Sequence, residues 1–263
     1  VWIREDFRLE NNAALSYATQ NHKNVIAFYI YNNNDYDNKR EAQKWWLSKS
    51  LENFKKDLFN YKINLQIIKG DELEIFSKIR KNDNVSVYWN KIYEPDVISK
   101  GKKIRDLFIK NEINFKYFKG NILNEFQEVT KNDKTPFKVF TPFWRTAEKI
   151  YLGHPPPKNY IVKKQSQIKS FFKNCINPND ILPKKNWHKK FENYWIVSEN
   201  NSKKILKNLI ENKIKDYGTS RDIPSVEGTS KLSPYIKFGQ IHVGTIWKKC
   251  NEIKSKGIGY RKY

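Results

Sequence analysis

The sequence contains few cysteines and no long apolar run. Cys175 and Cys250 are the two cysteines among 263 residues, and their spacing fits neither a paired metal-ligand motif nor a disulfide framework. The longest clearly apolar stretch runs from Val25 to Tyr31, whereas a helix needs roughly 20 apolar residues to cross a bilayer. We therefore expect a cytoplasmic protein with no membrane partner.

The start of the chain lacks a leader with a charged end, an apolar centre and small residues. Val1 already stands inside an apolar run, so we expect residues to precede it. At the other end the sequence stops at GIGYRKY, before its last helical unit has a core of its own. We expect the chain to continue there as well.

Two common nucleotide-binding motifs are missing, because neither the dinucleotide glycine fingerprint nor the Walker loop occurs. The histidines are too scattered for a metal cluster or a Ser/His/Asp triad, and we interpret them as surface or structural residues: His22, His154, His188 and His242. If the protein is an enzyme, we expect a bound cofactor to supply its chemistry.

Acidic residues are scarce relative to basic ones. The 50 Lys and Arg outnumber the 28 Asp and Glu, which gives a formal charge of +22. This excess favours a polyanionic partner, because cations that neutralise phosphates release counterions. Only 8 of the basic residues are arginine. A merely solvated, lysine-rich surface is the alternative.

The first half of the chain alternates short β-branched and aromatic runs with longer segments of helical periodicity. We expect buried strands at Val1–Ile3, Val25–Ile30, Leu65–Ile68, Val85–Trp89 and Phe115–Phe118. We expect helices at Asn12–Gln20, Arg40–Tyr61, Glu72–Lys81 and Val97–Asn111. This alternation predicts an α/β fold with a doubly wound, five-stranded parallel sheet, which binds ligands outside the carboxyl ends of its strands.

The character of the sequence changes after about Asn121. Thr141 and Pro142 are placed as N-cap and first residue of a helix that reaches Ile150. An irregular stretch rich in lysine and proline follows, and a helical pattern resumes at Leu206. We predict an α/β domain over 1–125, a connector over 126–200 and the start of an all-α domain over 201–263.

The stretch GTSKLSP, residues 228–234, combines hydroxyl groups, a cation and a helix start. Ser233 followed by Pro234 is typical of an N-cap and a first helical residue, which is a structural role. Amides at a helix start and the hydroxyls of Thr229, Ser230 and Ser233 would also hold a phosphate. One turn can serve both purposes.

Three other residues have both a structural and a functional interpretation. Glu94 follows a predicted strand and is placed to line a ligand crevice, although a lone carboxylate is also typical of a solvated surface. Trp45 and Trp46 lie at helical spacing, so we expect them in the core rather than in a base-stacking platform.

Several stretches together resemble the photolyase and cryptochrome family in order and spacing. VWIREDFRLENNAAL (1–15) is similar to the family's opening strand and loop, and KVFTPFWR (138–145) to the segment that leaves its antenna domain. YGTSRDIPSVEGTSKLSPYIKFGQI (217–241) resembles the start of its flavin domain. The likeness is greatest to class I cyclobutane-dimer photolyases and covers about the first half of a member.

The resemblance implies FAD as the cofactor. The positions that match residues holding FAD are Tyr217, Thr229, Ser230, Lys231, Leu232 and Ser233, the last five around its phosphates. Arg221 matches a DNA-contacting arginine. At Lys231 many members carry Arg, so the charge is kept while the bidentate fork is lost. The catalytic residues are expected beyond Tyr263.

The implied activity is light-dependent repair of cyclobutane pyrimidine dimers in DNA, with an electron from reduced FAD and the lesion flipped out of the duplex. We expect a monomer that binds dimer-containing DNA, and a fragment of this length to be inactive alone. One alternative is a cryptochrome, which binds flavin without repair. Another is a non-enzymatic, nucleotide-binding α/β protein.

A second, antenna chromophore is also implied, but its identity stays open. Members that bind a folate antenna typically carry an Asn-Glu pair near the position of Glu94, where this sequence has Asp96 and Val97. A deazaflavin, another flavin and an empty crevice are the alternatives.

Overall fold

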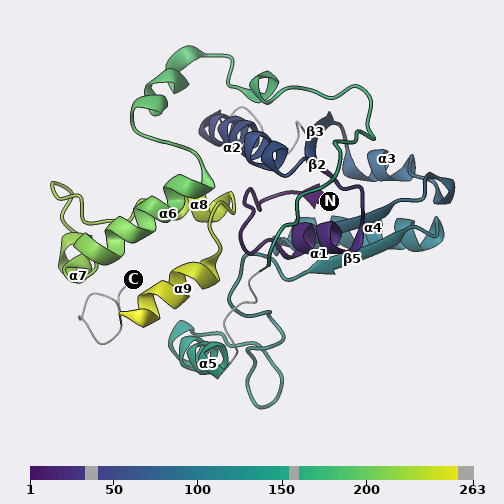
Figure 1. Ribbon diagram of the computed structural model, residues 1–263. Coiled ribbons are helices and arrows are strands. Elements are labelled where there is room, and N and C mark those ends of the chain that lie inside the picture. The colour runs from purple at the N-terminus through teal and green to yellow at the C-terminus, as the bar shows by residue number, and fades with distance from the viewer. Residues whose placement is uncertain (33–40, 154–159, 254–263) are drawn as a thin grey trace.

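The computed structural model describes residues 1–32, 41–153 and 160–253 (Figure 1). Its centre is a five-stranded sheet of order β3-β2-β1-β4-β5 in which every neighbouring pair is parallel. The strands are β1 (Trp2–Ile3), β2 (Ile26–Tyr31), β3 (Asn64–Lys69), β4 (Ser86–Asn90) and β5 (Asn114–Phe118). The predicted doubly wound parallel sheet is confirmed.

Helices cover both faces of this sheet. They are α1 (Ala13–Asn21), α2 (Glu41–Asn60), α3 (Glu72–Ser77) and α4 (Pro95–Lys110), with a short 3-10 turn η3 (Lys81–Asp83). Alternate residues of a strand point to opposite faces. Accordingly Ile3 and Tyr29 belong to one core cluster with α1 and α2, whereas Trp2 and Phe28 belong to a second with α3 and α4.

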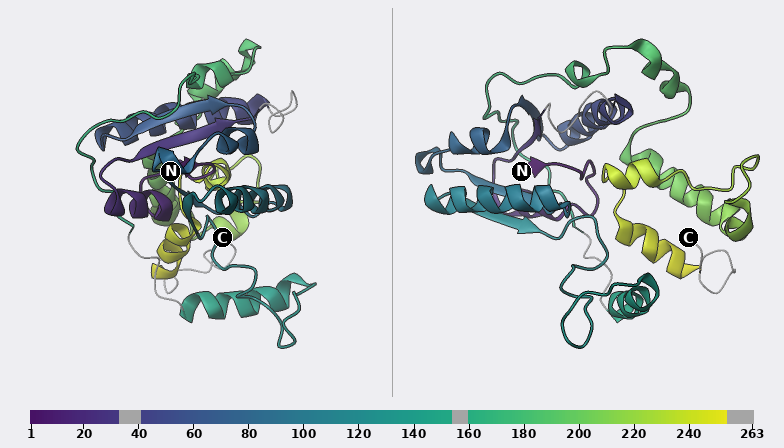
Figure 2. Two further views of the ribbon diagram at one scale, coloured as in Figure 1. Left: turned by 90° about the vertical axis from the view of Figure 1, so that its right-hand side faces the viewer. Right: turned by 180° about the vertical axis from the view of Figure 1, so that it is seen from behind.

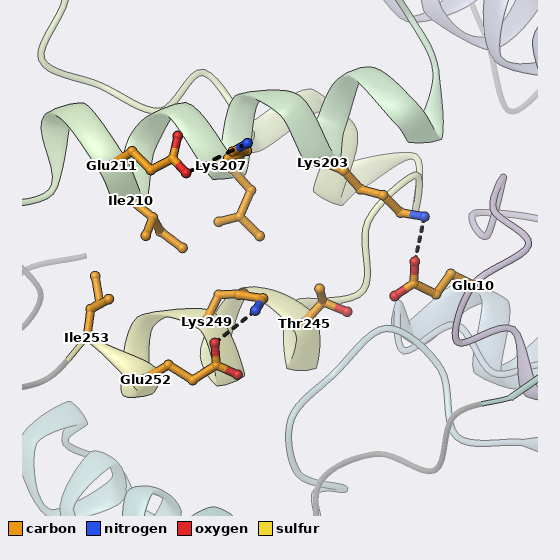
Figure 3. A pocket seen from close by; sticks show the side chains of 10 residues that line it. Glu10, Lys203, Lys207, Ile210, Glu211, Thr245, Lys249, Glu252 and Ile253 are labelled. Atoms are coloured by element: carbon orange, nitrogen blue, oxygen red, sulfur yellow. Dashed lines mark hydrogen bonds and ion pairs between the residues drawn. The ribbon is translucent and has the colours of Figure 1, made fainter.

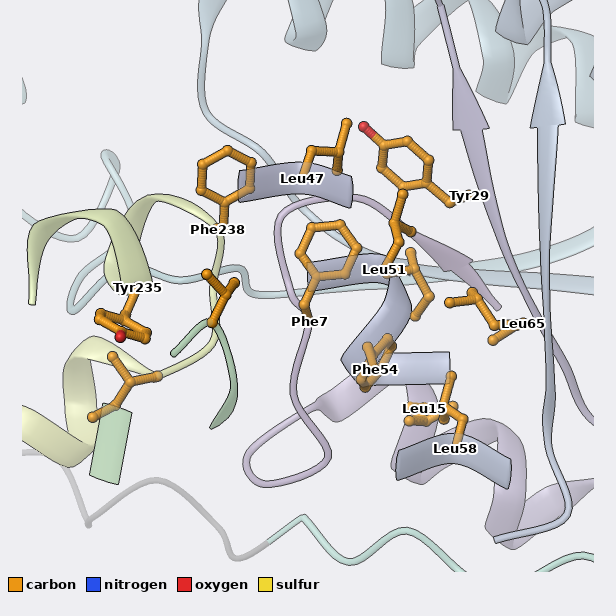
Figure 4. Packing of buried hydrophobic residues seen from close by; sticks show 14 of the residues in the cluster. Phe7, Leu15, Tyr29, Leu47, Leu51, Phe54, Leu58, Leu65, Tyr235 and Phe238 are labelled. Carbon is orange, nitrogen blue, oxygen red and sulfur yellow. The ribbon is translucent and has the colours of Figure 1, made fainter. Parts of the chain in front are cut away.

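The larger core cluster lies under α2 and continues into the second half of the chain. Figure 4 shows Phe7, Leu47 and Phe54 packed together, with Tyr235 and Phe238 extending the cluster. Trp45 and Trp46 are buried, as predicted. The α/β part and the helical part therefore share apolar contacts.

The two edge strands of the sheet differ from each other. Strand β5 is largely exposed, which corrects the expectation of a buried strand. The outer edge of β3 is covered, because Ile68 forms an antiparallel bridge with Cys175 and Gln66 hydrogen-bonds to residues 171 and 172. Both differences follow from tertiary contacts that strand periodicity cannot register.

The predicted connector lies across the sheet and its helices. Gln165 N donates to Tyr61 O at 2.8 Å, and Ser48 Oγ donates to Pro178 O at 2.8 Å. Two 3-10 turns, η4 (Pro178–Ile181) and η5 (Asn186–Asn193), stand in this stretch. Hydrogen bonds to α2 and β3 fix it in place despite its irregular sequence.

The remaining helices form a second group beside the sheet (Figures 1 and 2). They are α5 (Phe140–Gly153), α6 (Glu199–Asn208), the π-helix η6 (Leu209–Lys213), α7 (Tyr217–Ser220), α8 (Ser233–Lys237) and α9 (Val243–Glu252). Helix α5 begins one residue before the predicted cap, and α6 begins earlier than its apolar pattern indicated, where Ser198 caps it. No helix in the described ranges is long and apolar enough to span a membrane.

Candidate functional site

One glycine brings the loop that carries the predicted flavin run against α7. A Cβ atom on Gly228 would lie 2.2 Å from the carbonyl oxygen of Ser220, so only glycine permits this approach of the two backbones. The approach places Gly228, the residue directly before the run Thr229–Ser233, against the last residue of α7, the helix that begins with Tyr217. Helix α7 follows the π-helix η6, a feature that is frequent at functional sites.

Within the run, one side chain is buried in the core and others face solvent. Leu232 is 1% exposed and belongs to the large core cluster. Thr229 and Ser233 are exposed, and their hydroxyl groups make no hydrogen bond to any residue that the structure describes. The Ser230 hydroxyl accepts a hydrogen bond from Leu232 N at 3.3 Å. The run therefore presents two hydroxyl groups from a fixed backbone.

Lys231 adopts an unusual backbone conformation in the middle of this run. Its φ of 56° is in the left-handed region, which non-glycine residues rarely occupy. Strained residues of this kind concentrate at ligand sites, where surrounding contacts hold them. The Lys231 ammonium lies 2.6 Å from Glu227 Oε1, and this partner lowers the pKa of Glu227. Lys213 approaches the same carboxylate at 3.9 Å, so two cations share one anion.

The predicted N-cap role of Ser233 is wrong. Helix α8 begins at Ser233 itself, Leu232 occupies the cap position, and no side chain caps the helix. A leucine cannot accept the amide hydrogen bond that serine would. The Ser233 hydroxyl is consequently left to other partners.

Arg221 and Tyr217 lie one turn apart. The Arg221 guanidinium carbon is 5.5 Å from the centre of the Tyr217 ring, and its Nε is 3.4 Å from Asp222 Oδ1. Arg221 is exposed and Tyr217 is half-buried. The exposed position of this guanidinium suits the predicted contact with a phosphate group.

A second region of interest lies at the carboxyl ends of β1 and β4. Glu94 follows β4 there, as predicted, and directly precedes α4, but its carboxylate is ion-paired. Lys237 Nζ lies 2.8 Å from Glu94 Oε1 and 2.6 Å from Glu5 Oε1. The last residue of α8 is thus tied to the crevice where an α/β sheet binds its ligands.

Buried polar residues of the opening motif join the sheet to the helical group. Asn90 Nδ2 donates to Asp6 Oδ2 at 2.6 Å and to Asn12 Oδ1 at 2.9 Å. Arg8 donates to the carbonyl of Gly239 at 2.7 Å, and burial lowers the pKa of its guanidinium. Much of the motif VWIREDFRLENN therefore stabilises the joint between the sheet and the helical group, which includes Arg8 and Gly239.

Two further residues hold the sheet to the helical group and were not predicted from the sequence. Glu199 accepts hydrogen bonds from the amides of Leu9 and Glu10 at 2.7 and 3.2 Å. Asn121 donates to Ile236 O at 3.1 Å and accepts from Val243 N at 2.9 Å. Both are isolated polar residues without a motif, so only the folded contacts reveal them.

The described histidines are structural, as predicted. His242 is the N-cap of α9, where its Nδ1 accepts from Gly244 N at 3.0 Å, and burial with the nearby Arg8 charge lowers its pKa to about 3. His22 lies 2.7 Å from the hydroxyl of Tyr88, and His188 is buried. His154 lies outside the described residues.

A hollow of about 450 Å³ separates α6 and η6 from α9. Figure 3 shows side chains of these helices pointing into it. The charges at its rim form ion pairs, Lys203 with Glu10, Lys207 with Glu211 and Lys249 with Glu252. These pairs leave little net charge to attract a phosphate, unlike the run Thr229–Ser233.

A family profile described as DNA photolyase matches residues 1–161, more than half of the chain. The chain belongs to the DNA photolyase family. Among curated relatives of this family member is a deoxyribodipyrimidine photo-lyase of Agrobacterium fabrum, 29% identical over 94% of this chain and 52% of the relative. Cryptochrome-2 of Arabidopsis thaliana is 25% identical over 97% of this chain and 42% of that protein.

A solved structure agrees with this assignment to the photolyase family. A class III photolyase from Agrobacterium tumefaciens superposes with a TM-score of 0.84 at 26% identity, covering 98% of this chain and 53% of that one. The chain thus spans about half the length of the photolyases it matches. Its five-stranded α/β part has the fold of the family's N-terminal domain.

Proposed function

We propose that this photolyase-family chain contributes the phosphate clamp of a bound FAD to a light-dependent enzyme that repairs cyclobutane pyrimidine dimers in DNA. The observation that carries the proposal is the run Thr229–Ser233, which follows the close contact of Gly228 with α7 and presents the hydroxyl groups of Thr229 and Ser233 with no hydrogen-bond partner among the described residues. No side chain caps α8, so the Ser233 hydroxyl has no capping role there.

The residues of this segment have distinct roles in the proposal. The hydroxyls of Thr229 and Ser233 donate to flavin phosphate oxygens, and Lys231 adds a positive charge. Tyr217 borders the same site, and Leu232 fixes the run to the core. Arg221 contacts a DNA phosphate from the adjacent surface. Bound FAD would supply the photoexcited electron donor that splits the dimer.

A cryptochrome is the second candidate, because Cryptochrome-2 matches as much of the chain as the photo-lyase does. Nothing in the clamp separates the two activities. The predicted class I assignment has no support in the comparisons, in which one solved relative is a class III photolyase. We propose residues 201–263 as the beginning of the flavin domain, and we assign no identity to an antenna chromophore.

The test uses the protein produced from its whole reading frame. Flavin absorbance in the purified protein, followed by light-dependent loss of dimers from an irradiated oligonucleotide, is the expected result. Flavin without dimer loss would identify a cryptochrome. A protein that takes up no flavin would overturn both candidates and leave a nucleotide-binding α/β protein.

A further inference from the structure

The 3-10 turn η5 is held rigidly on the outer side of α2. Phe191 packs edge-on against Trp45 with ring centres 5.2 Å apart, and His188 is buried. Glu192 pairs with Lys49 of α2 at 2.8 Å. Figure 1 shows this turn as the green coil above α2. Its apolar side is therefore already covered by the protein.

The outward side of η5 has a strong positive charge. Four exposed lysines surround the turn: Lys184, Lys185, Lys189 and Lys190. None of them has an ion pair with a carboxylate in the parts of the chain that the structure describes, whereas Lys56 and Lys78 on other helices are paired. The two nearest acids are engaged, Glu192 by Lys49 and Glu41 by the indole of Trp187.

Two aromatic rings accompany these lysines. Tyr194 follows the turn and is 80% exposed, and Trp187 stands within it at 37% exposed. The hydrogen bond from Trp187 Nε1 to Glu41 at 2.8 Å and the ring contact with Phe191 at 5.1 Å fix the indole plane. The surface therefore combines unpaired cations with exposed aromatic rings.

We propose that this basic turn, residues 184–194, binds single-stranded nucleic acid. Lysines neutralise the backbone phosphates, and bases stack on Tyr194 and Trp187, as on other surfaces that bind single strands without sequence preference. A membrane surface fits less well, because an interfacial helix needs an apolar face to insert and η5 has packed that face on α2. A duplex would leave both rings unused.

This surface is separate from the proposed flavin site. Figures 1 and 2 show η5 beyond α2 and α7 at the far end of α6. Binding of nucleic acid at this surface is not part of the proposed repair function and needs neither flavin nor light. Binding measured in the dark without added FAD therefore tests it independently.

The experiment measures binding of a labelled oligothymidylate of about 16 nucleotides to the full chain by fluorescence anisotropy. One variant carries Lys184→Gln, Lys185→Gln, Lys189→Gln and Lys190→Gln. A matched control carries the same change at four exposed lysines elsewhere, Lys102, Lys103, Lys110 and Lys131. The logarithm of the association constant falls linearly with the logarithm of the salt concentration, and each phosphate contact contributes about 0.7 to the magnitude of that slope. The magnitude should therefore decrease by about 3 in the first variant only. Equal losses in both variants, or none, would overturn the proposal.

A second variant tests base stacking. Tyr194→Ala should weaken binding of the oligonucleotide about tenfold, as for the loss of one base stack, and leave the salt slope unchanged. A duplex of the same length should bind more weakly and not respond to Tyr194→Ala. Equal binding of duplex and single strand, or tighter binding of phosphatidylserine vesicles that is lost with the four lysines, would contradict single-strand recognition.

Discussion

The ammonium group of Lys237 lies 2.6 Å from the Glu5 carboxylate and so joins the end of α8 to the end of β1. Burial raises the pKa of Glu5 although Lys237 acts to lower it, whereas hydrogen bonds to Glu5 and Glu94 raise the pKa of Lys237 against its own desolvation. The pair is therefore unequal. The less exposed Glu5 carboxylate needs Lys237 to keep its charge, whereas Lys237 also has Glu94 as a partner.

Lys237→Met should consequently destabilise the protein more than Glu5→Gln. The first change leaves a partly buried carboxylate without its cation, and we expect a loss of about 1–2 kcal/mol, between the values of exposed and fully buried pairs because Lys237 is 43% exposed. Glu5→Gln removes the desolvated charge itself. Urea unfolding measures the loss in the free energy of unfolding for each variant. Equal losses for Lys237→Met and Glu5→Gln would contradict this prediction.

The neutral state of His242 should make stability depend on pH. Its pKa of about 3 is below that of an unfolded histidine, near 6.5, so between these values the unfolded chain binds a proton that the folded chain does not. This contribution is complete above pH 6.5 and is lost as the pH falls. Between pH 6.5 and pH 5 the free energy of unfolding should decrease by about 2 kcal/mol.

Urea unfolding at the two pH values measures this effect in wild type and in His242→Asn. Asparagine keeps a cap acceptor for Gly244 N but does not titrate. We expect the variant to lose most of the difference between the two pH values. If wild type and the variant show the same difference in free energy of unfolding, titratable groups other than His242 cause the pH dependence.

Gly239→Ala should be among the most damaging single changes. Gly239 has a φ of +62°, and a Cβ atom there would lie 1.9 Å from the carbonyl oxygen of Glu5. Backbone strain and overpacking together predict a loss of about 3 kcal/mol or more. Gly101→Ala is the control, because nothing lies within 4 Å of its position in α4 and a gain of about 0.5–1 kcal/mol is expected there. Equal effects on the unfolding midpoint would mean that the joint is not close-packed.

Asn121→Leu should separate the helical group from the sheet. The change leaves the amide of Val243 and the carbonyl of Ile241 without their side-chain partner, at a cost of about 1–3 kcal/mol for each group that stays buried, whereas the carbonyl of Ile236 keeps its hydrogen bond from Gly239 N. Hydrogen exchange would show faster opening of α9 than of β2. Uniform acceleration across the chain would instead indicate a single cooperative unit.

The α/β part of the fold could be predicted from the sequence because its signals are local. Buried strands such as Ile26–Tyr31 and the apolar stripe of α2 are visible as periodicity. The connector has no period, and its structure comes from contacts such as Gln66 with Phe172, which no local pattern encodes. The exposure of β5 has the same cause, since no local pattern shows which of the two edge strands another segment covers.

The candidate site was only partly predictable. The run Thr229–Ser233 was found because its residue types repeat a known motif, and the close approach of Gly228 to Ser220 supports the grouping. The cap at Ser233 was wrong because a one-residue shift of the helix start moved the serine out of the cap position. Glu199 and Lys237 were missed, since a lone charged residue gives no signal until the fold supplies its partner.

We propose that Thr229 and Ser233 hold flavin phosphates, and the dissociation constants for FAD and for riboflavin in the protein from its whole reading frame test this directly. The combined change Thr229→Ala and Ser233→Ala should weaken FAD binding at least tenfold, because hydrogen bonds to charged groups contribute about 1.5–3 kcal/mol each, and leave riboflavin binding unchanged. Ser225→Ala, an exposed serine of the same loop, is the control. Unchanged FAD affinity in the double variant, or equal weakening for riboflavin, would contradict the phosphate clamp.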